Sequence, residues 1–195
     1  MEAAKNQTDS WEEKRVSTRY PCDIDGFNKQ LIRNLSREGA YLDTDKNYQL
    51  NQELSLDFVL PTEADSVKVQ GRIVRRIERD GDRRGYGVQF QGLDKELQRR
   101  LDGYFVTNQE VFGKLEEVFQ EVLSDNDDVD FHREASIIND LSIDSLKVAE
   151  LSILLEQKFE QSFFLSDWFT CKDDPQELTV ASLVDYVTKK TRTVH

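Results

Sequence analysis

The sequence predicts a two-domain protein, a small antiparallel β-barrel followed by an all-helical bundle. Apolar residues alternate with polar ones in the first half of the chain, as in half-buried strands, and recur at helical spacing in the second half. The charge divides at the same place. Residues 1–105 hold 18 Lys and Arg against 19 Asp and Glu, whereas residues 106–195 hold 8 against 19. This asymmetry indicates two modules with different partners.

The barrel is expected over residues 13–105, after a disordered segment at residues 1–12. Three alternating strands are predicted over 54–60, 67–77 and 86–90, with the turn signal Asp80-Gly81 before the last one. Short strands at roughly ten-residue spacing are typical of a small barrel or sandwich. A helix over 93–104 is expected to close it. Four arginines predict one basic face: Arg72, Arg76, Arg83 and Arg84.

The helical domain is expected over residues 106–190. Thr107-Asn108-Gln109-Glu110 has the form of a capping box, which predicts that a new helix begins there with an apolar stripe from Val111 to Val122. A second helix is predicted over 146–159 and a last one from near Thr179. The domain boundary therefore falls near Val106, with a short linker.

Several function classes are disfavoured by composition. The longest apolar runs are shorter than the roughly 18–20 residues needed to cross a bilayer, and the start of the chain is polar, so we expect a cytoplasmic protein without a membrane span. The acidic second half would repel a nucleic acid polymer. His132 and His195 have no visible nucleophile partner, and no metal-ligand spacing is present, so we expect neither an enzyme nor a metal site.

Ser145 is placed where a polar stretch turns into an apolar-periodic helix. The Asp144-Ser145 pair can also be explained as an ordinary helix cap with no further function. However, residues 108–188, and the stretch from Leu141 to Phe159 above all, resemble an acyl carrier protein domain. The resemblance implies a four-helix bundle and a 4′-phosphopantetheine on Ser145, added by a phosphopantetheinyl transferase. The arm would then hold an acyl or aminoacyl thioester for loading and downstream transfer enzymes.

Docking of those enzymes would involve Asp144, Leu146, Glu150 and Glu156. Lys147 departs from the family, in which an acidic residue is frequent at this position, so general fatty-acid synthesis enzymes are less expected as partners.

The first half carries a second motif. Arg15 and Arg19 form an Arg-x-x-x-Arg pair, and Asn34-Leu35-Ser36-Arg37-Glu38-Gly39 follows. Together they resemble the PilZ domain, and the pieces GRIVRRIE and GYGVQF are similar to its barrel strands. The resemblance implies binding of cyclic di-GMP. The arginine forks would pair with phosphate or guanine, Asn34 and Ser36 would supply hydrogen bonds, and Gly39 would let the backbone pass closely.

The combination indicates a non-enzymatic regulatory carrier in which cyclic di-GMP controls docking of the carrier domain. Two alternatives remain open. The PilZ-like barrel could be retained for protein contacts alone. Both modules could also be adaptors, with Ser145 unmodified. The sequence does not identify the cargo, the loading enzyme, the number of bound dinucleotides or the oligomeric state.

Overall fold

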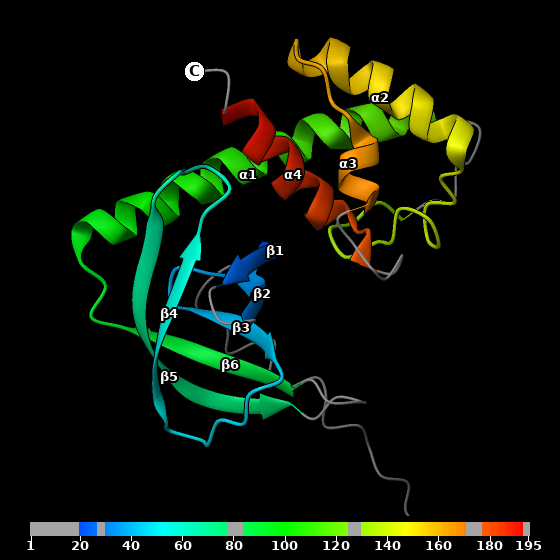
Figure 1. The fold of residues 1–195 in the computed structure, drawn as a ribbon. Helices are drawn as coiled ribbons and strands as arrows, with labels where there is room; N and C mark the ends of the chain where they lie inside the picture. Colours follow the sequence, from blue (N-terminus) through cyan, green and yellow to red (C-terminus); the bar gives the residue numbers. More distant parts are fainter. Residues whose placement is uncertain (1–19, 27–29, 78–83, 125–129, 171–176, 193–195) are drawn as a thin grey trace, which may run out of the picture.

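The computed structural model describes residues 20–26, 30–77, 84–124, 130–170 and 177–192. The expected disordered segment at residues 1–12, the arginines Arg15 and Arg19, Arg83 and the Asp80-Gly81 turn lie outside the described residues. Figure 1 shows two parts that share one long helix, with the curled sheet on one side and the shorter helices on the other.

Six antiparallel strands form the first part (Figure 1). They are β1 (Tyr20–Gly26), β2 (Gln30–Leu35), β3 (Gly39–Thr44), β4 (Glu53–Val59), β5 (Ser66–Ile77) and β6 (Arg84–Gln91). Their order in the sheet is β1-β2-β3-β6-β5-β4, and the sheet closes into a barrel where Gly26 of β1 pairs with Phe58 of β4. The antiparallel barrel expected from the sequence is therefore present.

The alternating pattern of the sequence corresponds to burial. On β4, Leu54, Leu56 and Phe58 are buried while Glu53 and Ser55 are exposed. Such alternation follows from the period of two in strand side chains. The predicted basic face is present in part: Arg72 and Arg76 are exposed on β5, whereas Arg84 is half-buried and donates to the Asp45 carbonyl at 3.1 Å.

Helix α1 (Lys95–Val122) corrects the predicted break between two helices and the short linker near Val106. The expected closing helix over 93–104 and the expected second helix from Thr107 are one continuous 28-residue helix, so the capping box does not form. Asp94 caps the start instead, with its carboxylate accepting from the Leu97 amide at 2.7 Å. The helix continues because one buried face passes without interruption through Leu101, Tyr104, Asn108 and Val111.

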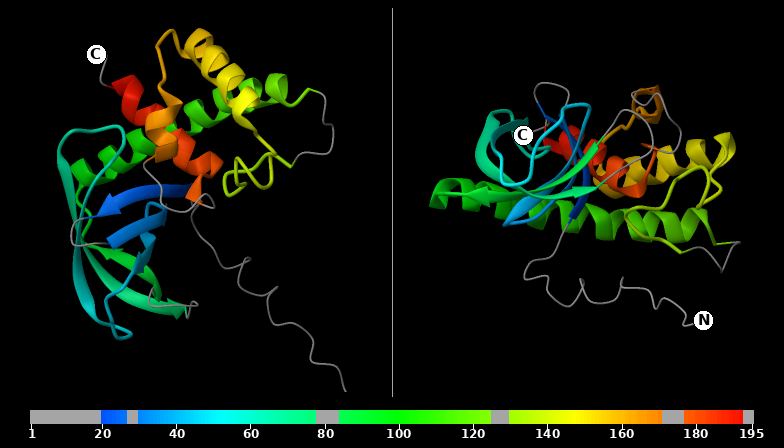
Figure 2. Two further views of the ribbon diagram at one scale, coloured as in Figure 1. Left: turned by 45° about the vertical axis from the view of Figure 1, so that its right-hand side comes forward. Right: turned by 90° about the horizontal axis from the view of Figure 1, so that it is seen from below.

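In the described residues, the second part also has the three helices α2 (Ser145–Phe159), α3 (Leu165–Thr170) and α4 (Val180–Arg192). Figure 2 shows α4 between the barrel and α2, crossing α1. Among the described residues, none of the helices has the length and apolar character that a membrane span requires.

The loop before α2 is fixed to the start of α4. The amides of Val180 and Ala181 donate to the carbonyls of Ala135 and Arg133 at 3.0 and 2.8 Å, and the Ile137 amide donates to Leu178 at 2.8 Å. Leu141 and Ile143 are buried in the helical core. The backbone leading to Ser145 is therefore held by hydrogen bonds as well as packing.

Candidate functional site

The Asn34-to-Gly39 motif forms the tight connection between β2 and β3. The Ser36 amide donates to the Gly39 carbonyl at 2.8 Å, and the Ser36 hydroxyl donates to the same oxygen at 3.1 Å. Ser36 is 5% exposed, so this hydroxyl holds the turn from within. A Cβ on Gly39 would lie 2.2 Å from the Val88 carbonyl oxygen of β6. The close backbone approach expected at Gly39 is therefore an approach to the neighbouring strand.

Strand pairing places the start of β1 beside this turn. Tyr20 pairs with Leu35 and Pro21 pairs with Asn34. Arg19 lies outside the described residues, but it directly precedes Tyr20 in the chain. Asn34 comes fifteen residues after Arg19 in the chain, and the pairing of β1 with β2 places Tyr20, the residue after Arg19, beside Leu35.

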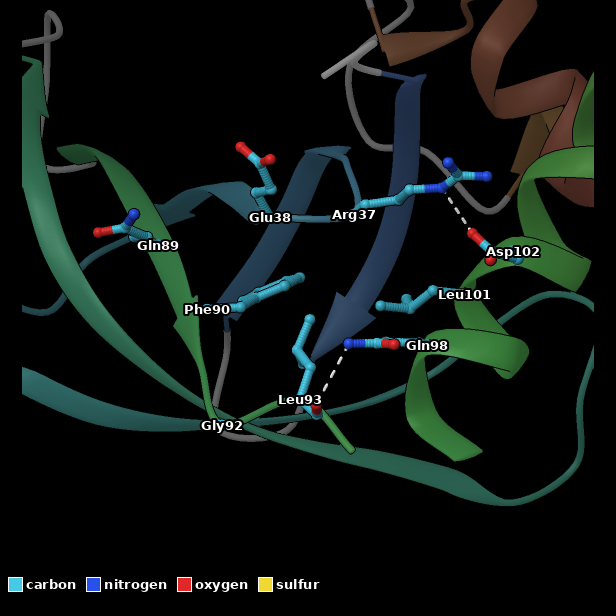
Figure 3. A pocket seen from close by; sticks show the side chains of 9 residues that line it. All are labelled: Arg37, Glu38, Gln89, Phe90, Gly92, Leu93, Gln98, Leu101 and Asp102. Atoms are coloured by element: carbon cyan, nitrogen blue, oxygen red, sulfur yellow. Dashed lines mark hydrogen bonds and ion pairs between the residues drawn. The ribbon is translucent and has the colours of Figure 1, made fainter. Parts of the chain in front are cut away.

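A cavity of about 610 Å³ opens next to the turn (Figure 3). The turn contributes Arg37 and Glu38, β6 contributes Gln89 and Phe90, and the remaining wall comes from α1 and the segment before it, through Gly92, Leu93, Gln98, Leu101 and Asp102. The volume lies within the range of small-molecule sites, roughly 300–1,000 Å³. Its wall is more polar than that of most such sites, since charged and amide side chains outnumber the apolar side chains of Phe90, Leu93 and Leu101.

One ion pair spans this cavity. The Arg37 guanidinium donates through Nε to Asp102 Oδ1 of α1 at 2.6 Å, and both side chains are largely accessible to solvent (Figure 3). An exposed pair of this kind contributes little to stability, at most about 1 kcal/mol. The Arg37 guanidinium can therefore exchange its carboxylate partner for a phosphate with little loss of stabilising free energy.

Ser145 is the first residue of α2 and is exposed. Asp144 caps the helix, since its Oδ1 accepts from the amides of Leu146 and Lys147 at 3.0 and 2.9 Å. The Ser145 hydroxyl has no hydrogen-bond partner within the described part of the chain. The cap function therefore belongs to Asp144, which leaves the serine hydroxyl accessible to a modifying enzyme.

The other predicted docking residues also face solvent. Leu146 is 77% exposed, and Glu150 and Glu156 are exposed on the same helix. An isolated leucine so fully exposed at a helix start has no packing role, whereas Leu151 and Leu155 fill the core. The structure does not bring Ser145 together with the Asn34-to-Gly39 turn, because α4 lies between α2 and the barrel (Figure 2).

A buried polar network joins the two parts instead. Tyr104 of α1 donates from its hydroxyl to Asp185 Oδ1 of α4 at 2.9 Å, and Asn108 donates to both the Tyr104 hydroxyl and Asp185 Oδ1 at 3.1 and 3.2 Å. Arg133, in the loop after α1, donates to Asn108 Oδ1 at 2.6 Å. Burial, helped by the charge of Asp185, raises the pKa of Tyr104 well above its ordinary value of 10.0.

The same network reaches the beginning of β1. The Tyr20 ring stacks on Phe105 with centroids 4.7 Å apart, and the Arg133 guanidinium lies 5.6 Å from the Tyr20 centroid. Burial lowers the pKa of Arg133 below its ordinary range. Arg33 of β2 adds a link, pairing with Asp43 of β3 at 3.6 Å and with Glu177 before α4.

Several residues with roles in these sites were not among the site residues predicted from the sequence: Tyr20, Arg37, Asp102, Tyr104, Asn108, Arg133 and Asp185. Arg37 stands inside the predicted motif, so its position was a usable signal. Asn108 and Arg133 gave none, because Asn108 binds Asp185, 77 residues away in sequence, and Arg133 binds Asn108 from 25 residues away. Among the described residues there is no group of three His, Cys, Asp or Glu side chains arranged to hold a metal ion.

Comparisons with known proteins concern the barrel. The family model of the PilZ domain matches residues 12–106. A search of curated proteins finds no match. Among solved structures, the Bacillus subtilis inhibitor of motility MotI/DgrA is similar over 49% of this chain and 51% of its own, with 18% identity and a TM-score of 0.42, so this chain spans about half of that protein. The acyl carrier resemblance of the helical part receives no support from these comparisons. Residues 12–106 therefore form a PilZ domain.

Proposed function

We propose that this chain is a non-enzymatic regulatory carrier that binds cyclic di-GMP through its barrel and carries a 4′-phosphopantetheine on Ser145. The dinucleotide site rests on the PilZ domain match together with the strand register that brings the start of β1 beside the Asn34-to-Gly39 turn. In this proposal Arg15 and Arg19 pair with phosphate or guanine edges. Asn34 adds a hydrogen bond, while Ser36 and Gly39 hold the turn against β6.

Isothermal titration calorimetry with cyclic di-GMP tests the receptor. We expect saturable binding to the full chain. Arg15→Ala and Arg19→Ala should each weaken it by about 2–5 kcal/mol, because each leaves a charged ligand group without its partner. Arg99→Ala is the matched control, since Arg99 is an exposed arginine on α1 that pairs with Glu96. Absence of wild-type binding would remove the receptor function, and equal loss in all three variants would show only a general charge effect.

The carrier function rests on the presentation of Ser145. Its hydroxyl is exposed and without an intramolecular partner, on a helix start whose cap is supplied by Asp144 and whose preceding loop is anchored by Leu141 and Ile143. These features fit a residue that a separate transferase must reach. When attached, the arm supplies a thiol for thioester formation. The chain itself would hold and present the arm, and the partner enzymes would carry out the reactions.

Intact-mass measurement after co-expression with a phosphopantetheinyl transferase tests this function. We expect the wild type to gain the mass of one phosphopantetheine and Ser145→Ala to gain none. Ser152→Ala is the matched control on the same helix, because the Ser152 hydroxyl donates to the Val148 carbonyl at 3.0 Å and is not free for modification. An unmodified wild type would instead favour the adaptor alternative, in which the acidic helices serve protein contacts alone.

Control of the carrier by the dinucleotide is the last step of the proposal. It is supported by the position of Tyr20, which follows Arg19 and contacts both Phe105 and Arg133. Ligand binding can shift a domain arrangement only if the two arrangements bind it with different affinity. We expect the rate of Ser145 loading, or the affinity of a loading enzyme, to change when cyclic di-GMP is added. Equal values with and without it would leave the two functions independent.

A further inference from the structure

A second cavity lies at the junction of the barrel and the helices, away from both sites described above. It holds about 470 Å³ and is lined by nine residues: Thr62, Thr107, Glu110, Val111, Lys114, Phe159, Thr188, Thr191 and Arg192. They come from the loop after β4, from α1, from the end of α2 and from the end of α4. Segments from both parts of the molecule therefore line this cavity.

Two threonines in this wall have unused hydrogen-bonding groups. The Oγ1 atoms of Thr62 and Thr188 are buried and have no partner within the described residues. Thr188 is 1% exposed. A helical hydroxyl ordinarily donates to the carbonyl one turn back, as Ser152 and Thr170 do at 3.0 and 2.9 Å. A buried hydroxyl without a partner is costly, so its retention at Thr188 points to a partner that binds there.

Two cations line the same cavity without a carboxylate partner in the described structure. The Lys114 ammonium lies 5.1 Å from the centroid of the Phe159 ring and forms no ion pair, although Glu110 stands one turn earlier on α1. Arg192 likewise forms none. The helical half of the chain carries a large excess of acidic residues. Two unpaired cations beside two hydroxyls without partners set this cavity apart from that acidic surrounding.

We propose that this cavity binds a small organic oxyanion, either a phosphate monoester or a carboxylate. Lys114 and Arg192 would neutralise its charge with charge-assisted hydrogen bonds. The Thr188 side chain would change from one χ1 rotamer to another, and its hydroxyl would then donate to the anion. Threonines in helices divide between two such rotamers. Val111 and Phe159 would contact its apolar part, and Glu110 would accept from a hydroxyl or amine of the same molecule. The volume, several times that of the anion alone, leaves room for this larger body.

Thermal unfolding of the full chain, with inorganic phosphate or acetate as probe and chloride at the same ionic strength as reference, tests the proposal. We expect a saturable rise in Tm with at least one of the two oxyanions, and the stronger probe identifies the class of the ligand. Lys114→Gln and Arg192→Gln should each weaken binding roughly tenfold or more, as for loss of one charge-assisted hydrogen bond. Glu110→Gln should strengthen it by removing a like charge.

Thr188→Val distinguishes a ligand-binding role of this threonine from a role in packing alone, because it should have opposite effects on Tm and on oxyanion binding. Without any probe it should raise Tm, because it removes an unpartnered buried hydroxyl at nearly constant volume, yet it should reduce the oxyanion effect. Lys158→Gln is the matched control, since Lys158 pairs with Glu117 outside the cavity. The Arg15→Ala/Arg19→Ala double variant should retain the effect, which separates this site from the dinucleotide site. The proposal is overturned if neither oxyanion exceeds chloride, if Lys158→Gln matches Lys114→Gln, or if the double variant loses the effect.

Discussion

Tyr104→Phe tests whether the buried network holds the barrel and the helical part together. The ring is fully buried and would stay in place, so packing is preserved and the hydroxyl alone is removed. That hydroxyl donates to Asp185 Oδ1 at 2.9 Å and accepts from Asn108 at 3.1 Å. A hydrogen bond to a charged group contributes about 1.5–3 kcal/mol. Asn108 still reaches Asp185 at 3.2 Å after the change, so the carboxylate keeps one donor.

We therefore expect the free energy of unfolding to fall by about 2 kcal/mol, which for a chain of this length lowers Tm by roughly 4–8 °C. Urea titration followed by far-ultraviolet circular dichroism measures the first quantity and calorimetry the second. Tyr186→Phe is the matched control on α4, where the hydroxyl donates to the Phe164 carbonyl at 2.9 Å in a more exposed setting, and should cost less than about 1 kcal/mol. If the two substitutions cost the same, the network does not hold the junction and this reasoning is refuted.

Three further predictions concern the junction, the turn and the loop before Ser145. Because burial raises the pKa of Tyr104, the unfolded chain loses this proton above about pH 10 while the folded chain retains it. The stability that wild type has over Tyr104→Phe should therefore shrink from pH 10 upward, by at most about 1.4 kcal/mol per pH unit, and urea midpoints at pH 9 and 11 measure this. Gly39→Ala should cost about 1–3 kcal/mol through the Val88 contact, whereas Gly103→Ala, which meets nothing within 4 Å on exposed α1, should stabilise by about 0.5–1 kcal/mol; equal Tm values for the two would contradict the role of the close approach. Ser142 has φ 52°, so Ser142→Gly should stabilise by up to about 1 kcal/mol in chemical denaturation, with Asn51→Gly, at φ 64°, gaining less because asparagine tolerates that region.

The strands and helices that bury one regular face were predictable from the sequence. Leu54, Leu56 and Phe58 show their burial directly as a period of two, and α2 begins within one residue of its predicted start because Asp144 is a strong cap. The predicted break between two helices near Val106 was wrong for a specific reason. Thr107 and Glu110 have the residue types of a capping box, but a cap forms only where the preceding turn is not helical. The apolar face that continues through Tyr104 and Val111 outweighs that local preference.

The candidate sites were predictable only where one segment carries them. Ser145 and the Asn34-to-Gly39 turn each lie within a short motif, so the sequence alone suggests them as candidates. The junction network could not be found this way, because Asn108 looks like a cap residue and Asp185 like a surface acid until folding brings them together. The same holds for both cavities, whose walls combine residues from elements far apart in sequence.

The continuous α1 helix bears on how a signal would travel from the barrel. A flexible linker would let the two parts move independently, whereas here Leu101 and Phe105 pack in the barrel core and Val111 and Leu115 pack in the helical core of the same rigid helix. Motion of one part relative to the other must then bend α1 or break contacts beside it, and the Tyr104–Asp185 bond is one such contact. Among the described residues, this restrained junction is one route by which a ligand on the barrel can change the helical part. Tyr20 is well placed for that, because it follows Arg19 in sequence and lies against both Phe105 and Arg133. Tyr20→Ala should therefore leave the affinity for cyclic di-GMP within about threefold while abolishing any effect of the dinucleotide on Ser145 loading; retention of that effect would place the coupling elsewhere.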